Sequence, residues 1–530
     1  MQTTAGPQAL AARVAILRAS LTRERLTSTT ALLLYIAFTA FLAHLLVAGN
    51  YGYFRDELYY VDASRHLAFG YVDFPPVVAL LAAIVRLFFG DSLVALHILP
   101  AVAGGLVVLL TGLMARELGG GRFAQALAAL GTLSAITFLA IDAIFSMDPF
   151  DELWWALLAY LLIRLIKREQ PRLWLLFGLV AGIGLETKFT LAFLGLGIVA
   201  GLLLTEQRAY FRAREIWLGG AIALALALPY VLWNTANGWP TVEFWGHYGG
   251  DLADNNPIRF LIEQSYTLNP LTLPLTLAGL HWLFRTREGK PFRALGWAYV
   301  VMLLLMMLLG TKSYFLAPAY PMLFAAGGVL LERVLTQRLA WLRPAYVVLL
   351  AASALYFAPL AMPVLPPATW VRYYGYLGGD AGAQQAQHET GVLPQWLADR
   401  FGWPEMTTTI AQVYRGLPAD EQAQACILTQ NYGEAGALNF YGPREHLPTA
   451  ISGHNSYYLW GMGHCTGQVL ITIGFDQSDL EQTYYSVKQA ATTHCTYCMP
   501  EEDNLPIYVA TQPKDGALSG AWQRIKHFNQ

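Results

Sequence analysis

Long apolar stretches recur along the chain up to about residue 362. A helix that crosses a bilayer needs about 20 largely apolar residues. Stretches near that length lie at 30–48, 97–115, 123–140, 149–166, 172–187, 189–205, 215–233, 268–284, 293–310, 314–333 and 342–362. A shorter apolar stretch, 75–90, is interrupted by Arg86. This pattern predicts a polytopic α-helical membrane protein with about eleven transmembrane helices.

The basic residues between these stretches predict the orientation. They concentrate in the connections 164–172, 208–214, 285–293 and 333–343, and in the N-terminal segment 1–29. Cytoplasmic loops carry an excess of Lys and Arg. The basic connections share one side only if 75–90 does not cross. We therefore expect 75–90 to form an interfacial helix within one external loop from 50 to about 96. The alternative is a full crossing with an unrecognised partner segment.

The composition changes near residue 366, where the long apolar stretches end. Short apolar runs at 425–428 and 468–473 are typical of buried strands, and 434–441 has a helical pattern. We expect three parts: a cytoplasmic N-terminal segment 1–29, a transmembrane domain 30–365, and a small extracytoplasmic α/β domain 366–530. The arginine-rich N-terminal segment lacks the features of a cleaved signal peptide.

Composition narrows the classes of function. The chain is 55% hydrophobic and 13% charged, whereas soluble domains carry roughly 25% charged residues. The formal net charge of -2 gives no indication of a nucleic-acid partner. The lipid bilayer is therefore the expected surrounding of most of the chain.

All four cysteines lie in the C-terminal region, at Cys426, Cys465, Cys495 and Cys498. An even number in an oxidising compartment favours structural disulfides, and four cysteines allow three pairings. A metal site using His464 or His494 is one alternative, and a redox role for the Cys495/Cys498 pair is another.

Ionisable and aromatic residues gather in the connections on the predicted outer face. Such residues are costly near hydrocarbon, so they indicate a functional site. A carboxylate can act as a general base toward an acceptor hydroxyl, and cations suit a lipid-linked phosphate. The set comprises Arg55, Asp56, Glu57, Tyr59, Tyr60, Asp73, Asp148, Lys188, Glu243, His247, Lys312 and Tyr314. Alternatively, Asp148 is a helix cap before Pro149, and the two lysines are snorkelling anchors. No metal-ligand spacing, P-loop or GxSxG motif is present.

Several motifs resemble the GT-C glycosyltransferases, most closely the protein O-mannosyltransferases and the bacterial lipid A aminoarabinose transferases. They are Arg55-Asp56-Glu57-Leu58-Tyr59-Tyr60, Asp73-Phe74-Pro75-Pro76, Phe89-Gly90, Leu99-Pro100, Ser146-Met147-Asp148-Pro149-Phe150 and Lys312-Ser313-Tyr314-Phe315-Leu316-Ala317-Pro318-Ala319-Tyr320-Pro321. The resemblance covers roughly residues 30–335. It implies inverting transfer from a polyprenyl-phosphate sugar, with Asp56 as the catalytic base. It also implies an interfacial helix in the first external loop. One position departs from the family: His97 stands where an arginine is common.

The sequence thus predicts a hexosyl- or pentosyltransferase of the cytoplasmic membrane, with its N-terminus inside and its C-terminal domain outside. We expect catalytic roles for Asp56, Glu57 and Asp148, and lipid-phosphate binding by Lys188, Lys312, Arg55 and Tyr314. Substrate contacts are expected from Asp73, Tyr59, Tyr60, Glu243 and His247. The expected partners are a polyprenyl-phosphate-linked sugar donor, a lipid, glycan or protein acceptor, and no nucleic acid. A divalent metal is left open because metal dependence varies in the superfamily. Alternatives are a transport or lipid-binding scaffold, or an inactive family member.

Overall fold

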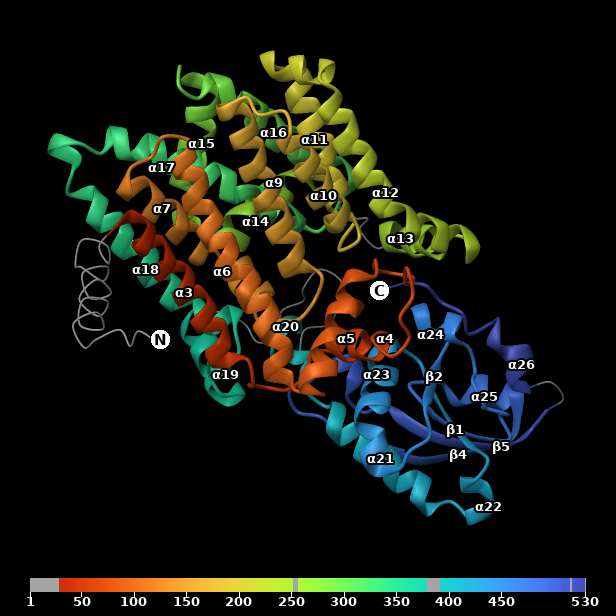
Figure 1. Ribbon diagram of the computed structural model, residues 1–530. Helices are drawn as coiled ribbons and strands as arrows, with labels where there is room; N and C mark the ends of the chain where they lie inside the picture. The colour runs from red at the N-terminus through yellow and green to blue at the C-terminus, as the bar shows by residue number, and fades with distance from the viewer. Residues whose placement is uncertain (1–27, 251–255, 379–390, 515–516, 530) are drawn as a thin grey trace, which may run out of the picture.

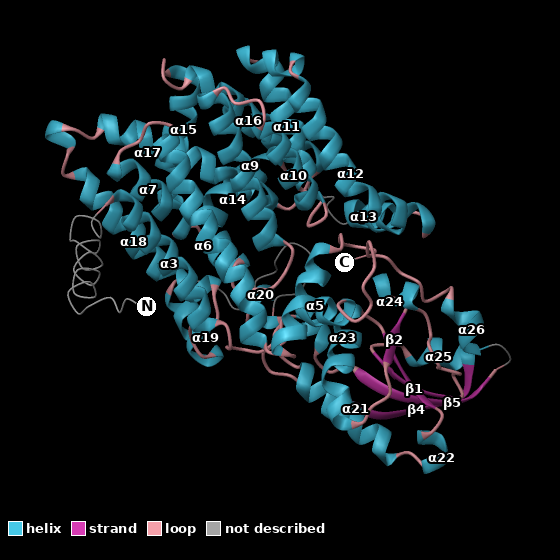
Figure 2. Ribbon diagram, viewed as in Figure 1, coloured by secondary structure: helices cyan, strands magenta, loops and turns pink. Residues whose placement is uncertain are grey.

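The computed structural model describes residues 28–250, 256–378, 391–514 and 517–529, and it places a bundle of helices beside a smaller region that contains all the described strands (Figures 1 and 2). Every predicted apolar stretch is helical. The helices are α3 (Thr29–Val47), α6 (Leu93–Glu117), α7 (Arg122–Leu133), α8 (Ile136–Ile141), α9 (Asp148–Arg168), α10 (Leu173–Leu185), α11 (Leu191–Leu203), α12 (Arg214–Ala236), α15 (Leu273–Arg285), α16 (Arg293–Leu309), α17 (Tyr320–Val334) and α18 (Leu342–Ala361). The predicted N-terminal segment lies almost entirely outside the described residues.

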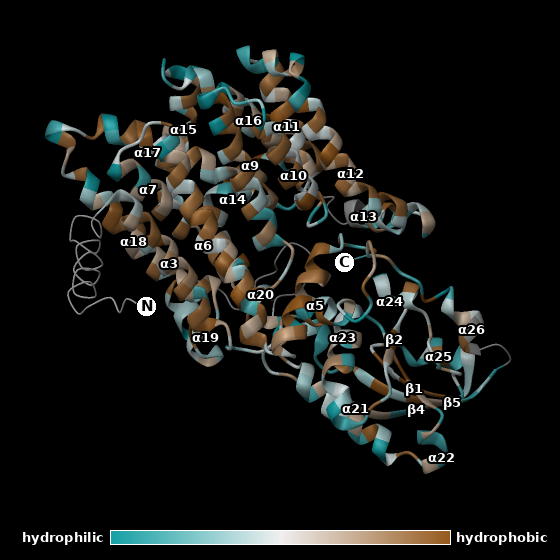
Figure 3. Cartoon of the chain, viewed as in Figure 1, coloured by the Kyte–Doolittle hydropathy of each residue, from teal (hydrophilic) through white to brown (hydrophobic). Residues whose placement is uncertain are grey.

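Six described segments are long and apolar enough to cross a bilayer, or seven if one bent pair counts as a single span. They are Thr29–Val47, Leu93–Glu117, Arg214–Ala236, Lys290–Leu309, Ser313–Val334 and Gln337–Ala361. Large apolar side chains such as Leu224, Leu308 and Leu355 are more than 70% exposed on the bundle surface, and apolar residues dominate its helices (Figure 3). In water such a surface would be unstable, whereas lipid covers it without cost. The chain is a multi-pass membrane protein, and the figure of about eleven crossings stays a prediction.

Small residues allow the bundle helices to approach closely. A Cβ on Gly279 of α15 would lie 2.2 Å from the Leu323 carbonyl oxygen of α17, and a Cβ on Gly327 would lie 2.0 Å from the Leu275 carbonyl oxygen. Because lipid is as apolar as the side chains, close packing takes the place of the hydrophobic effect in holding such helices together.

The helix α5 (Val77–Phe89) corresponds to the stretch predicted to lie in the interface. Its 13 residues extend about 20 Å at 1.5 Å per residue, which is shorter than the roughly 30 Å hydrocarbon core. One face is buried through Val78 and Ala82, while Leu87 and Phe88 are 78% and 72% exposed. An apolar helix that packs on protein with one face and exposes the other suits the edge of the bilayer, so its interfacial placement remains our prediction.

The C-terminal region contains a mixed five-stranded sheet in the order β2-β1-β3-β5-β4. Its strands are β1 (Ala425–Thr429), β2 (Ala450–Ser452), β3 (Val469–Ile473), β4 (Tyr484–Thr492) and β5 (Pro506–Pro513). The first three strands are parallel, and β5 runs antiparallel to both β3 and β4. The predicted strands at 425–428 and 468–473 are β1 and β3, and the predicted helix at 434–441 lies in α23 (Tyr432–Tyr441).

The remaining helices of four or more residues connect these elements or cover the sheet. They are α4 (Arg55–Ala63), α13 (Pro240–Gly250), α14 (Pro257–Leu268), α19 (Pro367–Tyr376), α20 (Gln395–Ala398), α21 (Trp403–Gly416), α22 (Ala419–Gln422), α24 (Asn455–Trp460), α25 (Gln477–Thr483), α26 (Ala517–Trp522), and the 3₁₀ helices η1 (Glu206–Arg212), η4 (Ser313–Ala319) and η6 (Gly442–Glu445). The 3₁₀ helices η2 (Pro270–Thr272), η3 (Lys290–Phe292), η5 (Gln337–Leu339) and η7 (Pro500–Glu502) are single turns.

The first external loop and the C-terminal region share one apolar core. Buried Tyr59, Tyr60 and Phe74 belong to the same cluster as Leu438 and Ile471. Asp62 at the end of α4 accepts hydrogen bonds of 2.8 Å from Asn439 and from the Tyr457 hydroxyl. The helix α4 is thereby fixed against α23 and α24, and it carries the residues that the sequence singles out most strongly.

Cys426 and Cys465 form a disulfide, while Cys495 and Cys498 are free thiols, so one of the two disulfides that four cysteines can form is present. The bridge links residues 39 positions apart in sequence. Replacing both by serine should lower the free energy of unfolding by roughly 2–5 kcal/mol, because the unfolded chain regains the freedom of a long loop.

Thermal unfolding of Cys426→Ser/Cys465→Ser under non-reducing conditions measures this effect. The matched control is Cys495→Ser, which keeps the bridge and should unfold close to the wild-type temperature. Equal melting temperatures for the double variant and the wild type would show that the bridge does not support the region.

Candidate active site

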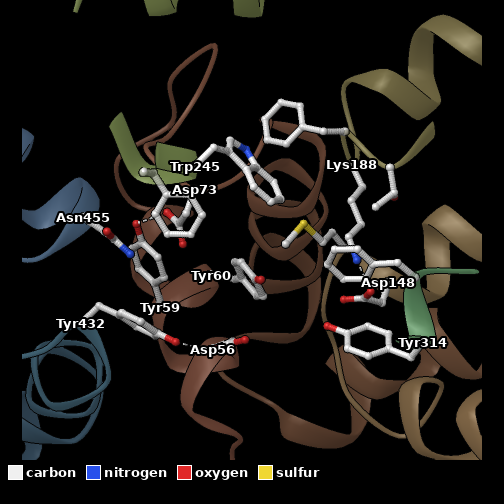
Figure 4. Close-up of a pocket in the computed structure, with 15 residues that line it drawn as sticks. Asp56, Tyr59, Tyr60, Asp73, Asp148, Lys188, Trp245, Tyr314, Tyr432 and Asn455 are labelled. Carbon is white, nitrogen blue, oxygen red and sulfur yellow. Dashed lines mark hydrogen bonds and ion pairs between the residues drawn. The ribbon is translucent and has the colours of Figure 1, made fainter. Parts of the chain in front are cut away.

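A pocket of about 90 Å³ lies where α4, the start of α9, the turn after α10, α13, η4 and the C-terminal region meet (Figure 4). Seven of the residues predicted from sequence line it: Asp56, Tyr59, Tyr60, Asp73, Asp148, Lys188 and Tyr314. The structure therefore brings together side chains from four separate connections of the membrane region. The rest of the lining comes from Met147, Phe189, Thr190, Phe244, Trp245, Phe315, Tyr432 and Asn455.

Asp56 lies in the first turn of α4 and forms part of one wall. The Tyr432 hydroxyl donates a 2.7 Å hydrogen bond to Asp56 Oδ1, and Arg55 Nε lies 3.9 Å from the same oxygen. Burial raises the pKa of Asp56 above its usual value, although Arg55, Tyr432 and Lys312 oppose that rise. A carboxylate with a raised pKa is a stronger base than an ordinary aspartate.

The opposite wall carries an ion pair between Lys188 and Asp148 (Figure 4). Asp148 is the first residue of α9, but its side chain contacts Lys188 and Ser146 and does not cap the helix. The Lys188 side chain is 7% exposed, so it is buried in the protein and does not snorkel to the membrane surface. Its Nζ lies 4.5 Å from the ring centre of Phe315 and 5.7 Å from that of Tyr314, within the range of a cation–π contact.

Asp73 forms a third part of the wall and is held by Tyr59. The Tyr59 hydroxyl donates a 2.9 Å hydrogen bond to Asp73 Oδ1 and accepts one of 3.1 Å from the Ser456 amide. Burial raises the pKa of Asp73 to about 7, and the hydrogen bond from Tyr59 opposes the rise. Asp73 is therefore suited to take or give a proton near neutral pH.

Glu57, which the sequence groups with Asp56, lies outside the pocket lining. Its Oε1 is 2.6 Å from His97 Nε2 and accepts a 2.7 Å bond from the Phe145 amide, while Oε2 accepts one from the Phe54 amide. Burial would raise the pKa of Glu57, but His97 holds it below the usual value. Glu57 thus anchors α4 to α6 and to the loop between α8 and α9. Its partner His97 occupies the position where the family that the motifs resemble commonly has an arginine.

Four other predicted site residues lie outside the pocket lining. Arg55 is behind the wall, with Nη2 3.7 Å from Asp399 and its guanidinium 5.3 Å from the Tyr432 ring centre. Glu243 accepts a 2.7 Å bond from Lys526, and His247 Nδ1 lies 3.0 Å from the Phe528 carbonyl oxygen, so both hold the C-terminal end. Lys312 follows α16 close to Asp56 and Lys188, and burial lowers its pKa to about 8 while Asp56 opposes that shift.

Four residues that line the pocket were not predicted from the sequence as site residues. Tyr432 and Asn455 come from α23 and α24 of the C-terminal region, and Phe244 and Trp245 come from α13. A capping box between Asn431 and Glu434 fixes the start of α23, which sets the position of Tyr432. The capping motif itself is legible in the sequence, but its distance from Asp56 is not.

The arrangement of acids does not fit a metal centre. Among the residues the structure describes, no three His, Cys, Asp or Glu side chains are grouped closely enough to hold a metal ion. Asp148 is paired with Lys188, and Asp56 with Tyr432. His494, considered as a ligand, lies 3.3 Å from Asp503. We assign no chemical step to a metal.

Comparison with known proteins identifies relatives of this region. Residues 73–233 match the family described as dolichyl-phosphate-mannose-protein mannosyltransferase. The chain is 27% identical over 297 residues to the lipid A galacturonosyltransferase RgtD of Rhizobium johnstonii, covering 53% of this chain and 61% of that one. It is 29% identical over 236 residues to an undecaprenyl phosphate-alpha-4-amino-4-deoxy-L-arabinose arabinosyl transferase of Sodalis glossinidius, covering 41% of each. The matches thus span less than two thirds of either relative.

The fold comparison extends further along the chain. The crystal structure of ArnT from Cupriavidus metallidurans bound to undecaprenyl phosphate superposes with a TM-score of 0.57 at 15% identity, covering 91% of this chain and 98% of that one. At this identity the likeness concerns the fold, and it includes the C-terminal region that the sequence motifs do not reach. The chain is therefore similar in sequence to membrane glycosyltransferases over part of its length, and it shares the fold of ArnT over most of it.

Proposed function

We propose that the chain transfers a sugar from a polyprenyl-phosphate-linked donor to a lipid acceptor at the outer face of the cytoplasmic membrane, with inversion at the anomeric carbon. The observation that carries this proposal is the pocket with a basic carboxylate on one wall and a buried cation on the other. Two relatives support the substrate class, since one is named for lipid A and the other for an undecaprenyl phosphate sugar. The N-terminus is proposed to be cytoplasmic and the C-terminal region extracytoplasmic.

The donor phosphate is proposed to bind at Lys188, with Tyr314 and Phe315 against the first units of the lipid. The donor phosphate is a diester with one negative charge, as the Asp148 carboxylate has, so it can form a charge-assisted hydrogen bond with Lys188 in place of or beside Asp148. When the bond between the anomeric carbon and the phosphate oxygen breaks, the electron pair stays on the phosphate. Lys188 and the nearby Lys312 stabilise that growing charge.

Asp56 is proposed to take the proton from the attacking acceptor hydroxyl or amine. Tyr432 holds Oδ1, and Figure 4 shows the carboxylate directed into the pocket. The acceptor oxygen or nitrogen forms a bond to the anomeric carbon from the face opposite the leaving phosphate, and a single displacement of this kind inverts the configuration. Tyr60 and Asp73 line the space between the walls, where they are placed to contact the sugar.

A transfer assay with purified protein tests the proposal. The full-length protein is incubated with lipid A and a panel of undecaprenyl-phosphate hexoses, uronic acids and amino-pentoses, and products are identified by mass spectrometry. We expect one donor class to give a lipid A product heavier by one sugar residue, together with free undecaprenyl phosphate. A protein that binds these donors but releases no lipid phosphate with any acceptor would be a scaffold and not a transferase.

The pH dependence of transfer follows from two groups. Asp56 must be deprotonated, and its raised pKa places the acidic limb above the usual range for an aspartate. Lys312 must be protonated, and its pKa of about 8 places the alkaline limb near that value. Because arginine stays protonated throughout this range, Lys312→Arg should remove the alkaline limb. A variant that keeps an alkaline limb near pH 8 would show that another group causes it.

A further inference from the structure

A second pocket, of about 290 Å³, lies beside the first between the loop after α4, the end of α12, and α24. We propose that it binds the saccharide headgroup of the lipid acceptor and so places the attacking hydroxyl or amine of the acceptor near Asp56. This inference rests on the proposed transferase function. The volume is near the lower end for small-molecule sites, roughly 300 Å³, which suits one or two sugar rings.

The pocket is built from a fixed loop. The Tyr71 hydroxyl donates to the carbonyl oxygens of Ala63 and His66 at 3.1 and 3.2 Å, which closes the loop on itself. A Cβ on Gly70 would lie 2.6 Å from both Trp233 and Tyr230, so only glycine allows α12 to pack this closely. The site is therefore largely formed before any ligand arrives.

Aromatic rings dominate the lining. The His66 ring stacks on Trp460 with centroids 4.3 Å apart and planes 14° apart. Trp233, on α12, stacks on Tyr230 with planes 14° apart. The flat C–H face of a sugar ring packs against such rings, while their N–H groups and the side chains of Asn237 and Ser456 supply hydrogen bonds. This chemistry fits a saccharide better than a bare acyl chain.

The two pockets share a wall. Tyr59 lines the first pocket, and its ring centre is 6.1 Å from that of Trp460 in the second. Ser456, which lines the second pocket, donates from its amide to the Tyr59 hydroxyl, which in turn donates to Asp73 in the first. Only the Tyr59 side chain therefore separates a saccharide that contacts Trp460 from the reacting groups of the first pocket.

Exposed apolar residues surround the second pocket. Leu67 and Phe69 of the loop are 57% and 67% exposed, and Leu232, one residue before Trp233, is 59% exposed. These side chains suit contact with lipid. The cations that suit the donor phosphate, Lys188 and Lys312, belong to the first pocket or its surroundings. An amphipathic acceptor, with its chains in the bilayer and its sugars in the pocket, satisfies both observations.

Equilibrium binding to the purified full-length protein tests the inference, with lipid A and undecaprenyl phosphate as separate probes. Trp460→Ala and Trp233→Ala should each weaken lipid A binding about tenfold, as expected for losing a central aromatic contact. Undecaprenyl phosphate binding should stay within twofold, which also shows that the variants fold. The matched control is Trp341→Ala, which removes a 65% exposed tryptophan outside both pockets.

The outcomes separate this inference from the proposed function. Unchanged lipid A affinity in both variants, equal loss for both probes, or no lipid A binding by the wild type would overturn the inference, even if transfer to another acceptor occurs. Selective loss of lipid A binding would support the inference even if no donor gave transfer, in which case only the proposed function would fail.

Discussion

Asp56→Asn is expected to lower the rate of sugar transfer by about 10²–10⁴-fold, the range that a general base contributes. Asparagine has nearly the same shape and still accepts the hydrogen bond from Tyr432, so the wall of the pocket should persist. Binding of undecaprenyl phosphate should be unchanged, because the proposed phosphate site at Lys188 is on the opposite wall. The measurement is kcat for transfer alongside the affinity for the lipid phosphate.

The control for this variant is Asp479→Asn, which neutralises an exposed carboxylate on α25 and should retain full activity. If Asp56→Asn kept more than about a tenth of wild-type kcat, a general base would not be acting at this position. Loss of activity together with loss of lipid-phosphate binding would instead indicate a damaged pocket.

Lys188→Met is expected to reduce both donor affinity and kcat, with a combined loss of about 10²–10³-fold in kcat/KM for the donor. The variant removes the buried cation that we assign to the phosphate. It also leaves the Asp148 carboxylate, only 19% exposed, without its partner, which destabilises the protein because an unpaired buried charge is costly. The measurements are donor kinetics and thermal unfolding of the same preparation.

A double variant separates these two effects. Lys188→Met/Asp148→Asn removes both charges, so it should recover much of the lost stability while donor kcat/KM stays low. Recovery of donor kcat/KM in the double variant would contradict a role of Lys188 in phosphate binding and would leave it a structural partner of Asp148. Lys488→Met, which removes an exposed lysine on β4, is the control for loss of a charge.

The helices of the membrane region were predictable because most of their residues are apolar over long stretches. The break within 123–140, where α7 ends at Leu133 and α8 begins at Ile136, was not, since no proline or charge marks it. In the C-terminal region the central strands β1 and β3 have continuous apolar runs, because both faces are covered. The edge strand β4 is largely exposed, and β2 has only three residues, so neither has a strong pattern.

The membrane half of the pocket was predictable for a different reason. Charges beside long apolar stretches are costly, so Asp56, Asp148 and Lys188 stood out. Adjacent residues of a helix point about 100° apart, which explains why Asp56 faces the pocket while Glu57 faces α6. The same geometry on α13 directs Phe244 to the pocket and Glu243 to Lys526.

Tyr432 could not have been found this way. It lies 376 residues from Asp56 in sequence and belongs to a short helix that is almost entirely buried. Only the docking of α23 on α4 brings the two together. That docking gives the C-terminal region, whose role the sequence leaves open, a direct place in the candidate site.

The most direct test of the proposed transfer compares release of undecaprenyl phosphate from a sugar-linked donor by the wild type and by Asp56→Asn, with and without lipid A. We expect release by the wild type only when the acceptor is present, in a one-to-one ratio with glycosylated lipid A of inverted anomeric configuration, and almost none by the variant. Equal release by both proteins, or a product with retained configuration, would contradict it.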